Sequence, residues 1–178
     1  MSHYRLKNAS HRSSSAGSSS RCDTFPNRFR MKSKTYRVVG LMSGSSLDGL
    51  DIAFCEFQIE RKSKTEVSVS DWKLTEAETV PFSQKWIDRL LGLSAQNAQI
   101  YAQTDVYFGY YLGDLVRDFL KKHQIKPDAI ASHGHTVFHN PEKRFTAQIG
   151  NGAAIAATVG FPVIHDFRTQ DISLFGEG

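Results

Sequence analysis

The residues with the clearest capacity for chemistry lie in one short segment, residues 40–51, which reads Gly-Leu-Met-Ser-Gly-Ser-Ser-Leu-Asp-Gly-Leu-Asp. Glycines let a backbone approach a ligand closely, and a turn of free N–H groups and hydroxyls holds phosphate oxygens. Asp48 or Asp51 suits Mg²⁺, which prefers oxygen ligands. The alternative is a plain hairpin turn, because Gly and Ser dominate turns. The segment is not a Walker A loop, since it lacks the lysine and the following helix.

A second polar cluster, Ser-His-Gly-His-Thr at residues 132–136, directly follows a predicted strand. We expect a turn there, since strand ends are common places for ligand contacts in α/β folds. With His139, His165 and Asp166, the histidines of this cluster also permit a metal-dependent hydrolase. The spacing does not establish the fixed ligand geometry that zinc requires.

Two further segments near the end of the chain carry polar groups. Residues 165–171, His-Asp-Phe-Arg-Thr-Gln-Asp, place two acids and an arginine after the last predicted strand. Such groups grip a polar ligand, although an exposed Asp–Arg pair of little energetic consequence fits the pattern equally. Residues 148–151, Gln-Ile-Gly-Asn, form either a turn or a contact to sugar hydroxyls.

The strands that must position these segments follow from hydrophobic periodicity. Apolar runs at 36–42 and 50–57 predict two strands joined by the Ser/Gly-rich turn. Alternation at 67–70 and 74–80 predicts two half-buried strands, so the first four elements form an antiparallel meander.

Two helices and a strand–helix–strand segment follow. Ser83 is a predicted N-cap for a helix whose apolar residues are Trp86, Ile87, Leu90 and Leu91. A second helix is predicted over 98–123, with one apolar face made by Phe108, Leu112, Leu115 and Phe119. Strands are predicted at 129–132, 145–149 and 161–164, and a small-residue helix at 152–159 ends at Gly160. This order predicts an α/β fold with a mixed sheet and flanking helices.

Composition bounds the class of protein. The chain has 178 residues, 40% hydrophobic and 22% charged, which is ordinary for one globular domain. No run approaches the roughly 20 apolar residues of a membrane span. Of the net charge of +4, residues 1–30 carry +5 and the remainder −1, so the basic balance does not indicate a nucleic-acid-binding body. We expect neither nucleic-acid nor membrane partners.

The cysteines and the first 30 residues bear on compartment and processing. Cys22 and Cys55 suggest neither a disulfide framework nor a zinc site, and Cys55 is expected to be a buried free thiol in a reducing, cytoplasmic compartment. Residues 1–30 hold eight serines and no hydrophobic periodicity, which predicts a disordered tail. Such a tail is either a transit peptide or an extension ahead of a start at Met31.

Four motifs in order give the chain a family resemblance. Gly-Leu-Met-Ser-Gly-Ser-Ser-Leu-Asp-Gly (40–49), Ser-His-Gly-His-Thr (132–136), Gln-Ile-Gly-Asn (148–151) and Asp-Phe-Arg (166–168) together resemble the anhydro-N-acetylmuramic acid kinase family. The resemblance covers residues 36–178. It implies a truncated ribonuclease-H-like lobe of the actin-like ATPase fold, with 31–178 as the amino-terminal lobe.

The resemblance also implies an activity and its residues. The family uses ATP and Mg²⁺ to phosphorylate the 6-oxygen of 1,6-anhydro-N-acetylmuramic acid while water opens the anhydro ring, in peptidoglycan recycling. Its partners are ATP and an amino sugar, and its full-length form is a homodimer. The implied nucleotide-binding residues are Ser43, Gly44, Ser45, Ser46, Leu47, Asp48, Gly49 and Leu50. The implied sugar-binding residues are His133, Gly134, His135, Thr136, Gln148, Asp166 and Arg168.

The sequence departs from the family pattern at three points. Ser45 stands where the family usually has Thr, and His135 stands where it usually has Gln. The family's catalytic aspartate belongs to a Gly-Pro-Gly-Asn segment beyond Gly178, so we expect this chain to be inactive alone. The alternative is a non-catalytic nucleotide- or sugar-binding remnant.

Overall fold

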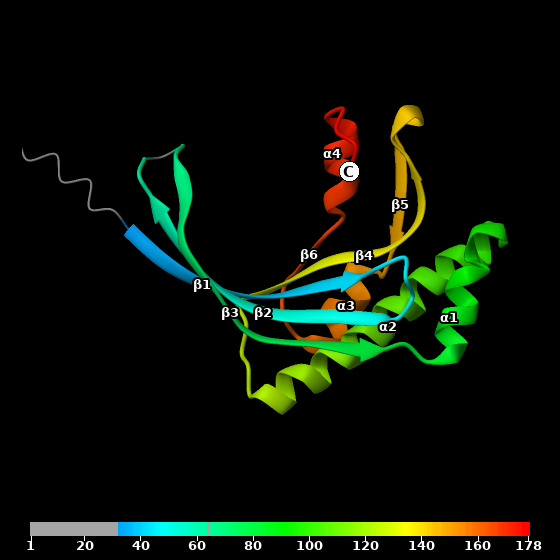
Figure 1. The fold of residues 1–178 in the computed structure, drawn as a ribbon, viewed down its shortest axis with the longest axis horizontal. Coiled ribbons are helices and arrows are strands. Elements are labelled where there is room, and N and C mark those ends of the chain that lie inside the picture. Colours follow the sequence, from blue (N-terminus) through cyan, green and yellow to red (C-terminus); the bar gives the residue numbers. More distant parts are fainter. Residues whose placement is uncertain (1–31, 64) are drawn as a thin grey trace, which may run out of the picture.

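The computed structural model describes residues 32–63 and 65–178, and the predictions made for residues 1–30 lie outside this part. Six strands form one mixed sheet (Figure 1). The strands are β1 (Lys32–Ser43), β2 (Gly49–Arg61), β3 (Val67–Pro81), β4 (Ala129–Asn140), β5 (Phe145–Ile149) and β6 (Val163–His165). The helices are α1 (Gln84–Leu91), α2 (Ala98–His123), α3 (Gly152–Val159) and α4 (Phe167–Ser173), with 3₁₀ turns at Leu93–Ala95 and Pro141–Lys143.

The sheet is mixed because its centre combines hairpins with parallel crossovers. β1 pairs antiparallel with β2, and β2 pairs antiparallel with β3, whereas β4 lies parallel to β1. The far edge of β4 is shared: its first half pairs in parallel with β6 and its second half pairs antiparallel with β5. The carboxyl ends of β1 and β6 therefore lie at the same end of the sheet as the middle of β4.

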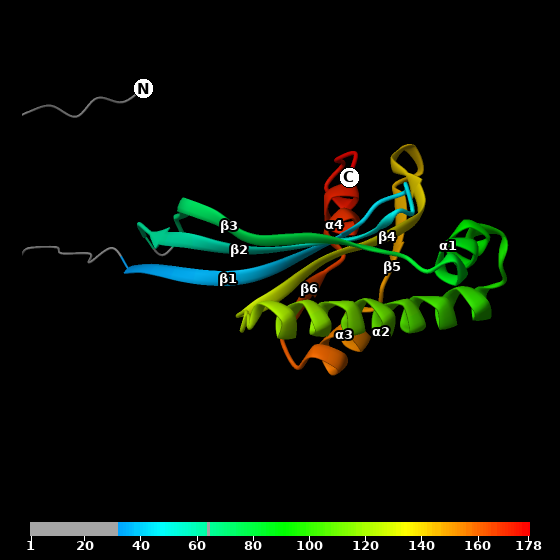
Figure 2. The ribbon, with the colours of Figure 1, turned by 60° about the horizontal axis from the view of Figure 1, so that its bottom comes forward.

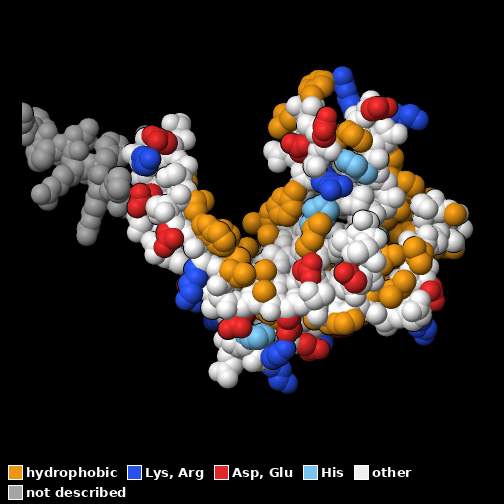
Figure 3. Space-filling model, viewed as in Figure 1, with side chains coloured by type: hydrophobic (Ala, Val, Ile, Leu, Met, Phe, Trp, Pro, Cys, Tyr) orange, Lys and Arg blue, Asp and Glu red, His pale blue; other side chains and the backbone are white. Residues whose placement is uncertain are grey.

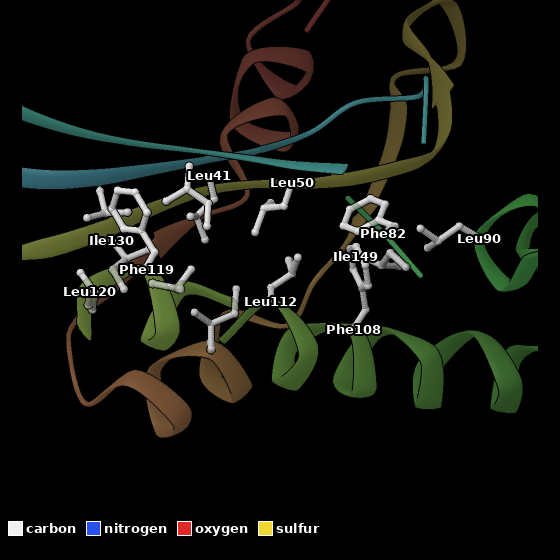
Figure 4. Close-up of a cluster of buried hydrophobic side chains, with 14 of the residues drawn as sticks. Leu41, Leu50, Phe82, Leu90, Phe108, Leu112, Phe119, Leu120, Ile130 and Ile149 are labelled. Atoms are coloured by element: carbon white, nitrogen blue, oxygen red, sulfur yellow. The ribbon is translucent and has the colours of Figure 1, made fainter. Parts of the chain in front are cut away.

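The core lies between the sheet and α2. Figure 2 shows α2 and α3 on one side of the strands, with α4 and the β4–β5 hairpin rising on the other. Phe108, Leu112, Val116 and Phe119 of α2 are at most 1% exposed and belong to one buried cluster. Figure 4 shows Phe108, Leu112 and Phe119 turned toward buried side chains of the strands. Burying each such side chain contributes about 1.5–3 kcal/mol. Leu115, a predicted face residue, is only partly buried, because Val116 occupies the centre of the face.

The first strands differ from the prediction in number and exposure. Residues 67–80 form one continuous strand, β3, so the meander has three strands rather than four. Register shifts opposite Phe54/Cys55 and Gln58/Ile59 are β-bulges that break its alternation. The outer half of β3 is exposed rather than half-buried, with Trp72 at 64%, because this end of the sheet extends past the helices (Figure 2).

Several predicted helix details also change. Ser83 occupies the N-cap position of α1 but its side chain makes no capping bond, and Leu91 is exposed. α2 has the predicted bounds, and the Asn97 side chain caps it by accepting from Ile100 N at 3.0 Å. α3 has the predicted bounds and ends at Gly160 with φ +75°.

The end of the chain contains the largest corrections. Residues 132–136, predicted as a turn, lie inside the twelve-residue strand β4. The last strand is Val163–His165, shorter and later than predicted, and residues 167–173 form the unpredicted helix α4. Cys55 is half-buried rather than buried, and burial raises the pKa of its thiol.

Candidate active site

The turn between β1 and β2 carries the first polar segment. Ser43 ends β1 and is 2% exposed, whereas Ser45 and Ser46 are exposed. Leu47 has φ +57° and a buried side chain, and its N–H lies 3.3 Å from the Gly44 carbonyl oxygen. The buried side chain of Leu47 therefore anchors the turn to the core, whereas Ser45 and Ser46 remain exposed.

The carboxylates of this segment are held by neighbouring hydroxyls. Ser46 Oγ donates to Asp48 Oδ1 at 2.7 Å, and this bond, followed by backbone N–H groups, lowers the pKa of Asp48 below its ordinary 3.8. Asp51 accepts from the Thr79 hydroxyl. At Gly49 a Cβ would lie 2.4 Å from the Val80 carbonyl oxygen, so only glycine lets β2 start so close to β3.

His135, a predicted sugar-binding residue, faces the core of the lobe. It is 6% exposed, its Nδ1 lies 3.2 Å from Ser43 Oγ, and its ring meets that of Phe108 edge-on at 6.2 Å. Burial lowers its pKa below 6.5. The cause is a bulge: Leu41 pairs with Ser132 but Ser43 pairs with His135, and Gly134 takes up the extra residue with φ +74°. The bulge turns His135 to the helix side of the sheet.

A pocket opens where the two partners of β4 diverge. It lies between the ends of β5 and β6 and has a volume of about 230 Å³. Its lining comprises Asp105, Ser132, His133, Gly134, Ala147, Gln148, Ile149, Gly150, Asn151, His165, Asp166 and Thr169. Four of the predicted sugar-binding residues are therefore brought together: His133, Gly134, Gln148 and Asp166. His135, Thr136 and Arg168 are not part of the lining.

Two buried polar atoms in this pocket have no protein partner within the part of the chain that the structure describes. Ser132 is 0% exposed and its Oγ makes no hydrogen bond. Gln148 Oε1 is likewise buried without a partner. An unsatisfied buried polar group costs about 1–3 kcal/mol, so a side-chain rearrangement that lets these atoms bond a ligand or water would be favoured.

Asp105 is a pocket residue that the sequence did not reveal. It lies in the first half of α2. Its Oδ1 accepts a hydrogen bond from Gly150 N at 2.8 Å, and its Oδ2 accepts one from Asn151 Nδ2 at 3.1 Å. Asn151 N also donates to the Asp105 carbonyl at 3.2 Å, and Asn151 Oδ1 caps α3 through Ala154 N. Asp105 thus fixes the β5–α3 turn, and nothing in the helical pattern distinguishes it from a solvent-facing acid.

Thr136 and Arg168 lie next to the pocket and are joined to it through Gln148. Gln148 Nε2 donates to Thr136 Oγ1 at 3.4 Å, and Arg168 Nη1 donates to the same oxygen at 3.5 Å. Asp166 is the N-cap residue immediately before α4, with φ +66°, and its side chain makes no capping bond. Its carboxylate is therefore not used to cap the helix.

Sheet register brings the turn and the pocket to one end of the sheet. Ser43 is the register partner of His135, and His135 is the register partner of Ile149, which lines the pocket. The two polar regions are therefore neighbours across three strands. In the described ranges, no three or more His, Cys, Asp or Glu side chains gather in a group able to hold a metal ion. None of the helices described for residues 32–178 combines the length and apolarity of a membrane span.

Comparison with known proteins identifies the family of this chain. A sequence profile described as anhydro-N-acetylmuramic acid kinase matches residues 36–178. The protein of that name from Paramagnetospirillum magneticum is 35% identical over 144 residues, covering 79% of this chain and 38% of the relative. Those from Pasteurella multocida (33% identical; 83% and 39% covered) and Photobacterium profundum (37% identical; 80% and 37% covered) are similar.

The chain spans less than two-fifths of the length of these relatives. Its strands β3-β2-β1-β4-β6, with β2 antiparallel to its neighbours and β4 and β6 parallel to β1, have the ribonuclease-H-like order of an actin-like ATPase lobe. The profile match over 36–178 and the four ordered motifs agree with that fold. The chain therefore belongs to the anhydro-N-acetylmuramic acid kinase family.

Proposed function

We propose that this chain forms the amino-terminal lobe of an ATP-dependent kinase that acts on 1,6-anhydro-N-acetylmuramic acid in the cytoplasmic recycling of peptidoglycan. The observation that carries the proposal is the pocket beside β4, where Ser132 Oγ and Gln148 Oε1 are buried without protein partners. The pocket lies at the same end of the sheet as the Ser/Gly turn. A sugar in the pocket and a nucleotide at the turn would therefore be adjacent.

The turn would bind the ATP phosphates. Residues 43–50 offer the hydroxyls of Ser45 and Ser46 and a backbone that side chains do not shield at Gly44. Asp48 and Asp51 present exposed carboxylates, an oxygen donor set that fits Mg²⁺. Bound Mg²⁺ would offset the phosphate charge, and phosphoryl transfer requires chiefly such positioning and charge stabilisation.

The pocket would bind the sugar through hydrogen-bond acceptors. Asp105, Asp166 and Gln148 supply carboxylate and amide oxygens, which suit hydroxyl and acetamide N–H donors. His133 lies in the same lining, with Nδ1 at 2.9 Å from the Gly134 carbonyl oxygen. Gly134 is required there, because a Cβ would lie 2.7 Å from the Ile149 carbonyl oxygen. His135 does not line this pocket.

The reaction consumes one ATP and one water. The sugar O6 attacks the γ-phosphorus and ADP leaves, while water adds to C1, the C1–O6 bond breaks and a base accepts the water proton. The product is N-acetylmuramic acid 6-phosphate. A carboxylate base would activate the water, and we assign it to the larger part of the family that this chain does not span. On this proposal the residues described here bind the ligands, and full-length members of the family turn them over as homodimers.

Titration calorimetry tests the proposal on the chain as it exists. We expect 1,6-anhydro-N-acetylmuramic acid to bind, and Gln148→Ala to weaken binding about tenfold, as one lost hydrogen bond does. The control Gln103→Ala changes an exposed residue of α2 and leaves binding unchanged. A folded chain that does not bind the sugar would contradict the proposal.

A second measurement separates the kinase from a non-catalytic binding module. ADP release is followed with Mg-ATP and the anhydro sugar, for this chain and for a full-length relative such as the Pasteurella multocida protein. Sugar-dependent ADP release by the relative, lost on changing its counterpart of Gln148, supports a catalytic site. Binding without turnover in both proteins favours the non-catalytic alternative.

A further inference from the structure

The start of the Ser/Gly turn is held by a side chain of β4. Ser43 ends β1 and is 2% exposed, and its Oγ lies 3.2 Å from His135 Nδ1. The same two residues are register partners in the parallel β1–β4 pair. Among residues 32–63 and 65–178, this is the one side-chain hydrogen bond that joins residues 43–49 to β4. The contact therefore links the turn to the strand whose middle lines the pocket.

The far end of the turn is fixed by other contacts. The side chain of Leu47 is buried, and Phe82 N donates to the Asp48 carbonyl oxygen at 3.4 Å. Between the two ends lie residues 44–46, whose backbone and hydroxyls would meet a phosphate group. Ser45 and Ser46 are exposed, so no packing holds their side chains in place. The position of these residues therefore depends on the two ends of the turn, one of which is Ser43.

His135 is itself rigidly placed. Figure 3 shows histidine side chains at the surface where α4 approaches the β4–β5 hairpin, whereas His135 is only 6% exposed. Its ring meets Phe108 of α2 edge-on at 6.2 Å, and its other register partner, Ile149, lines the pocket. Burial lowers the pKa of His135, so its ring is neutral near pH 7. A neutral imidazole nitrogen either donates to a hydroxyl or accepts from it, so both tautomers can bond Ser43.

We infer that His135 is a positioning residue for the nucleotide: it holds Ser43, and through Ser43 the phosphate-binding turn, at a fixed place relative to the pocket. The inference rests on the proposed function, because it assumes that the turn receives the ATP phosphates. It replaces the sugar-binding role that the family resemblance implies for His135, which does not line the pocket. His135 acts through Ser43 and does not touch the nucleotide.

An NMR titration of this chain with Mg-ATP tests the inference. We expect Mg-ATP to shift the amide resonances of residues 44–47. His135→Leu keeps an apolar side chain against Phe108 but removes Nδ1, and should weaken Mg-ATP binding about tenfold, as one lost hydrogen bond does. The affinity for 1,6-anhydro-N-acetylmuramic acid should not change. His135→Asn should restore most of the Mg-ATP affinity, because its amide begins at the same carbon as the imidazole ring and one polar atom replaces Nδ1.

A double-mutant cycle assigns the effect to the bond between the two side chains. Ser43→Ala and His135→Leu remove the same bond from its two ends, so the double variant should bind Mg-ATP no more weakly than Ser43→Ala alone. His139→Leu is the matched control, because it removes an exposed histidine from the same strand and should leave Mg-ATP binding unchanged. Additive losses in the double variant overturn the inference.

A readout without ligand separates this inference from the proposed function. Leu47 N lies 3.3 Å from the Gly44 carbonyl oxygen, so a turn released at Ser43 should exchange the Leu47 amide hydrogen faster. We expect faster exchange in His135→Leu and slow exchange in His135→Asn. Unchanged exchange in His135→Leu overturns the inference, and so does an equal loss of Mg-ATP and sugar affinity, since that result marks a general structural role.

The remaining outcomes are also assigned. An unmodified, folded chain whose turn resonances do not respond to Mg-ATP overturns the nucleotide part of the proposed function, and the exchange of the Leu47 amide then decides whether His135 holds the turn. Where His135→Leu does not fold, Ser43→Ala decides, because it removes the same bond from the side of β1. Slow exchange at Leu47 in that variant overturns the inference.

Discussion

The β1–β2 turn and the pocket beside β4 are held together by different kinds of contact. In the turn, Ser46 bonds Asp48 two residues away and Leu47 N approaches the Gly44 carbonyl. In the pocket, Asp105 bonds residues 45 and 46 positions away in sequence. The side-chain hydrogen bond of the turn is therefore local, although the buried Leu47 also fixes the turn to the core. The pocket exists only when α2, β4, β5 and β6 have packed.

The two regions are therefore sensitive to different kinds of substitution. Glycines matter in both, but for different reasons: Gly49 permits a close approach of β2 to Val80, whereas Gly134 combines a close approach with a positive φ. The polar side chains of the turn change the pKa of a solvent-exposed carboxylate. The polar side chains of the pocket bond buried groups in place of water, so their loss leaves those groups without a hydrogen-bond partner.

The largest effect is expected at Gly134 in the pocket. In Gly134→Ala the Cβ meets the Ile149 carbonyl at 2.7 Å and the residue must keep φ +74°. Left-handed backbone costs about 1–2 kcal/mol and overpacking about 1–3 kcal/mol, so the free energy of unfolding should fall by about 3 kcal/mol. Urea denaturation measures it. Gly160→Ala is the control, because Gly160 has φ +75° but a Cβ there would have nothing within 4 Å. This variant should lose only the backbone cost of about 1–2 kcal/mol. Equal losses at the two sites would show that the contact of the Cβ with the Ile149 carbonyl oxygen adds nothing.

Gly49 tests the corresponding approach in the turn. Gly49→Ala places a Cβ 2.4 Å from the Val80 carbonyl oxygen without a positive φ, so we expect a loss of about 1–3 kcal/mol. Thermal and urea unfolding give the value. Gly44→Ala is the control from the same turn, because its Cβ meets only the movable Ser46 hydroxyl at 3.2 Å and should be tolerated. Equal losses in the free energy of unfolding for the two variants would contradict the close approach at Gly49.

Asp105→Asn tests the long-range bonds that define the pocket. An asparagine keeps one acceptor for Gly150 N but turns an NH₂ group toward Nδ2 of Asn151, so two donors face each other. The amide oxygen of Asn151 cannot accept instead, because it caps α3. The expected loss in the free energy of unfolding is about 1–2 kcal/mol. Asp118→Asn, at an exposed position of α2, should lie near zero. Faster amide hydrogen exchange at Gly150 and Asn151 would localise the effect, and unchanged exchange would contradict it.

His135 makes stability depend on pH. Its folded-state pKa is lowered by burial, so the unfolded chain binds more protons once the pH drops below about 6.5. The stability that depends on a neutral His135 is therefore fully present above about pH 6.5 and is lost as the pH falls from there toward the lower pKa of the folded state. His135→Gln should flatten the melting temperature over this window, while His139→Gln, at an exposed histidine, should not. An unchanged pH profile in His135→Gln would show that another group titrates.

The smallest effect is expected in the turn, at Ser46. Ser46→Ala removes the hydroxyl that contributes most to lowering the pKa of Asp48, so this pKa should rise toward 3.8 with little change in stability, because Asp48 is exposed. NMR titration of the carboxyl group measures the shift. Ser45→Ala, at the neighbouring exposed serine, should leave the pKa unchanged. An unchanged pKa of Asp48 would show that the hydrogen bond between Ser46 and Asp48 does not form in solution.

The sequence by itself determined the features that rest on short-range physics. The 98–123 helix, the 152–159 helix with its glycine end and the Ser/Gly turn follow from spacing and turn chemistry within a few residues. The four ordered motifs determined the family in the same way. His133, Gly134, Gln148 and Asp166 are predicted site residues because they belong to those motifs, and the structure brings them into one pocket.

Only the tertiary structure decided which side chains meet. A bulge at Gly134 reversed the side to which His135 points, and alternation alone cannot foresee an inserted residue. The exposure of β3 depended on how far α2 reaches along the sheet, which no strand pattern contains. Asp105 became a pocket residue because α2 packs beside the β5–α3 turn. Each of these outcomes depends on register and packing between segments distant in sequence, and so on the free energy of the whole folded lobe.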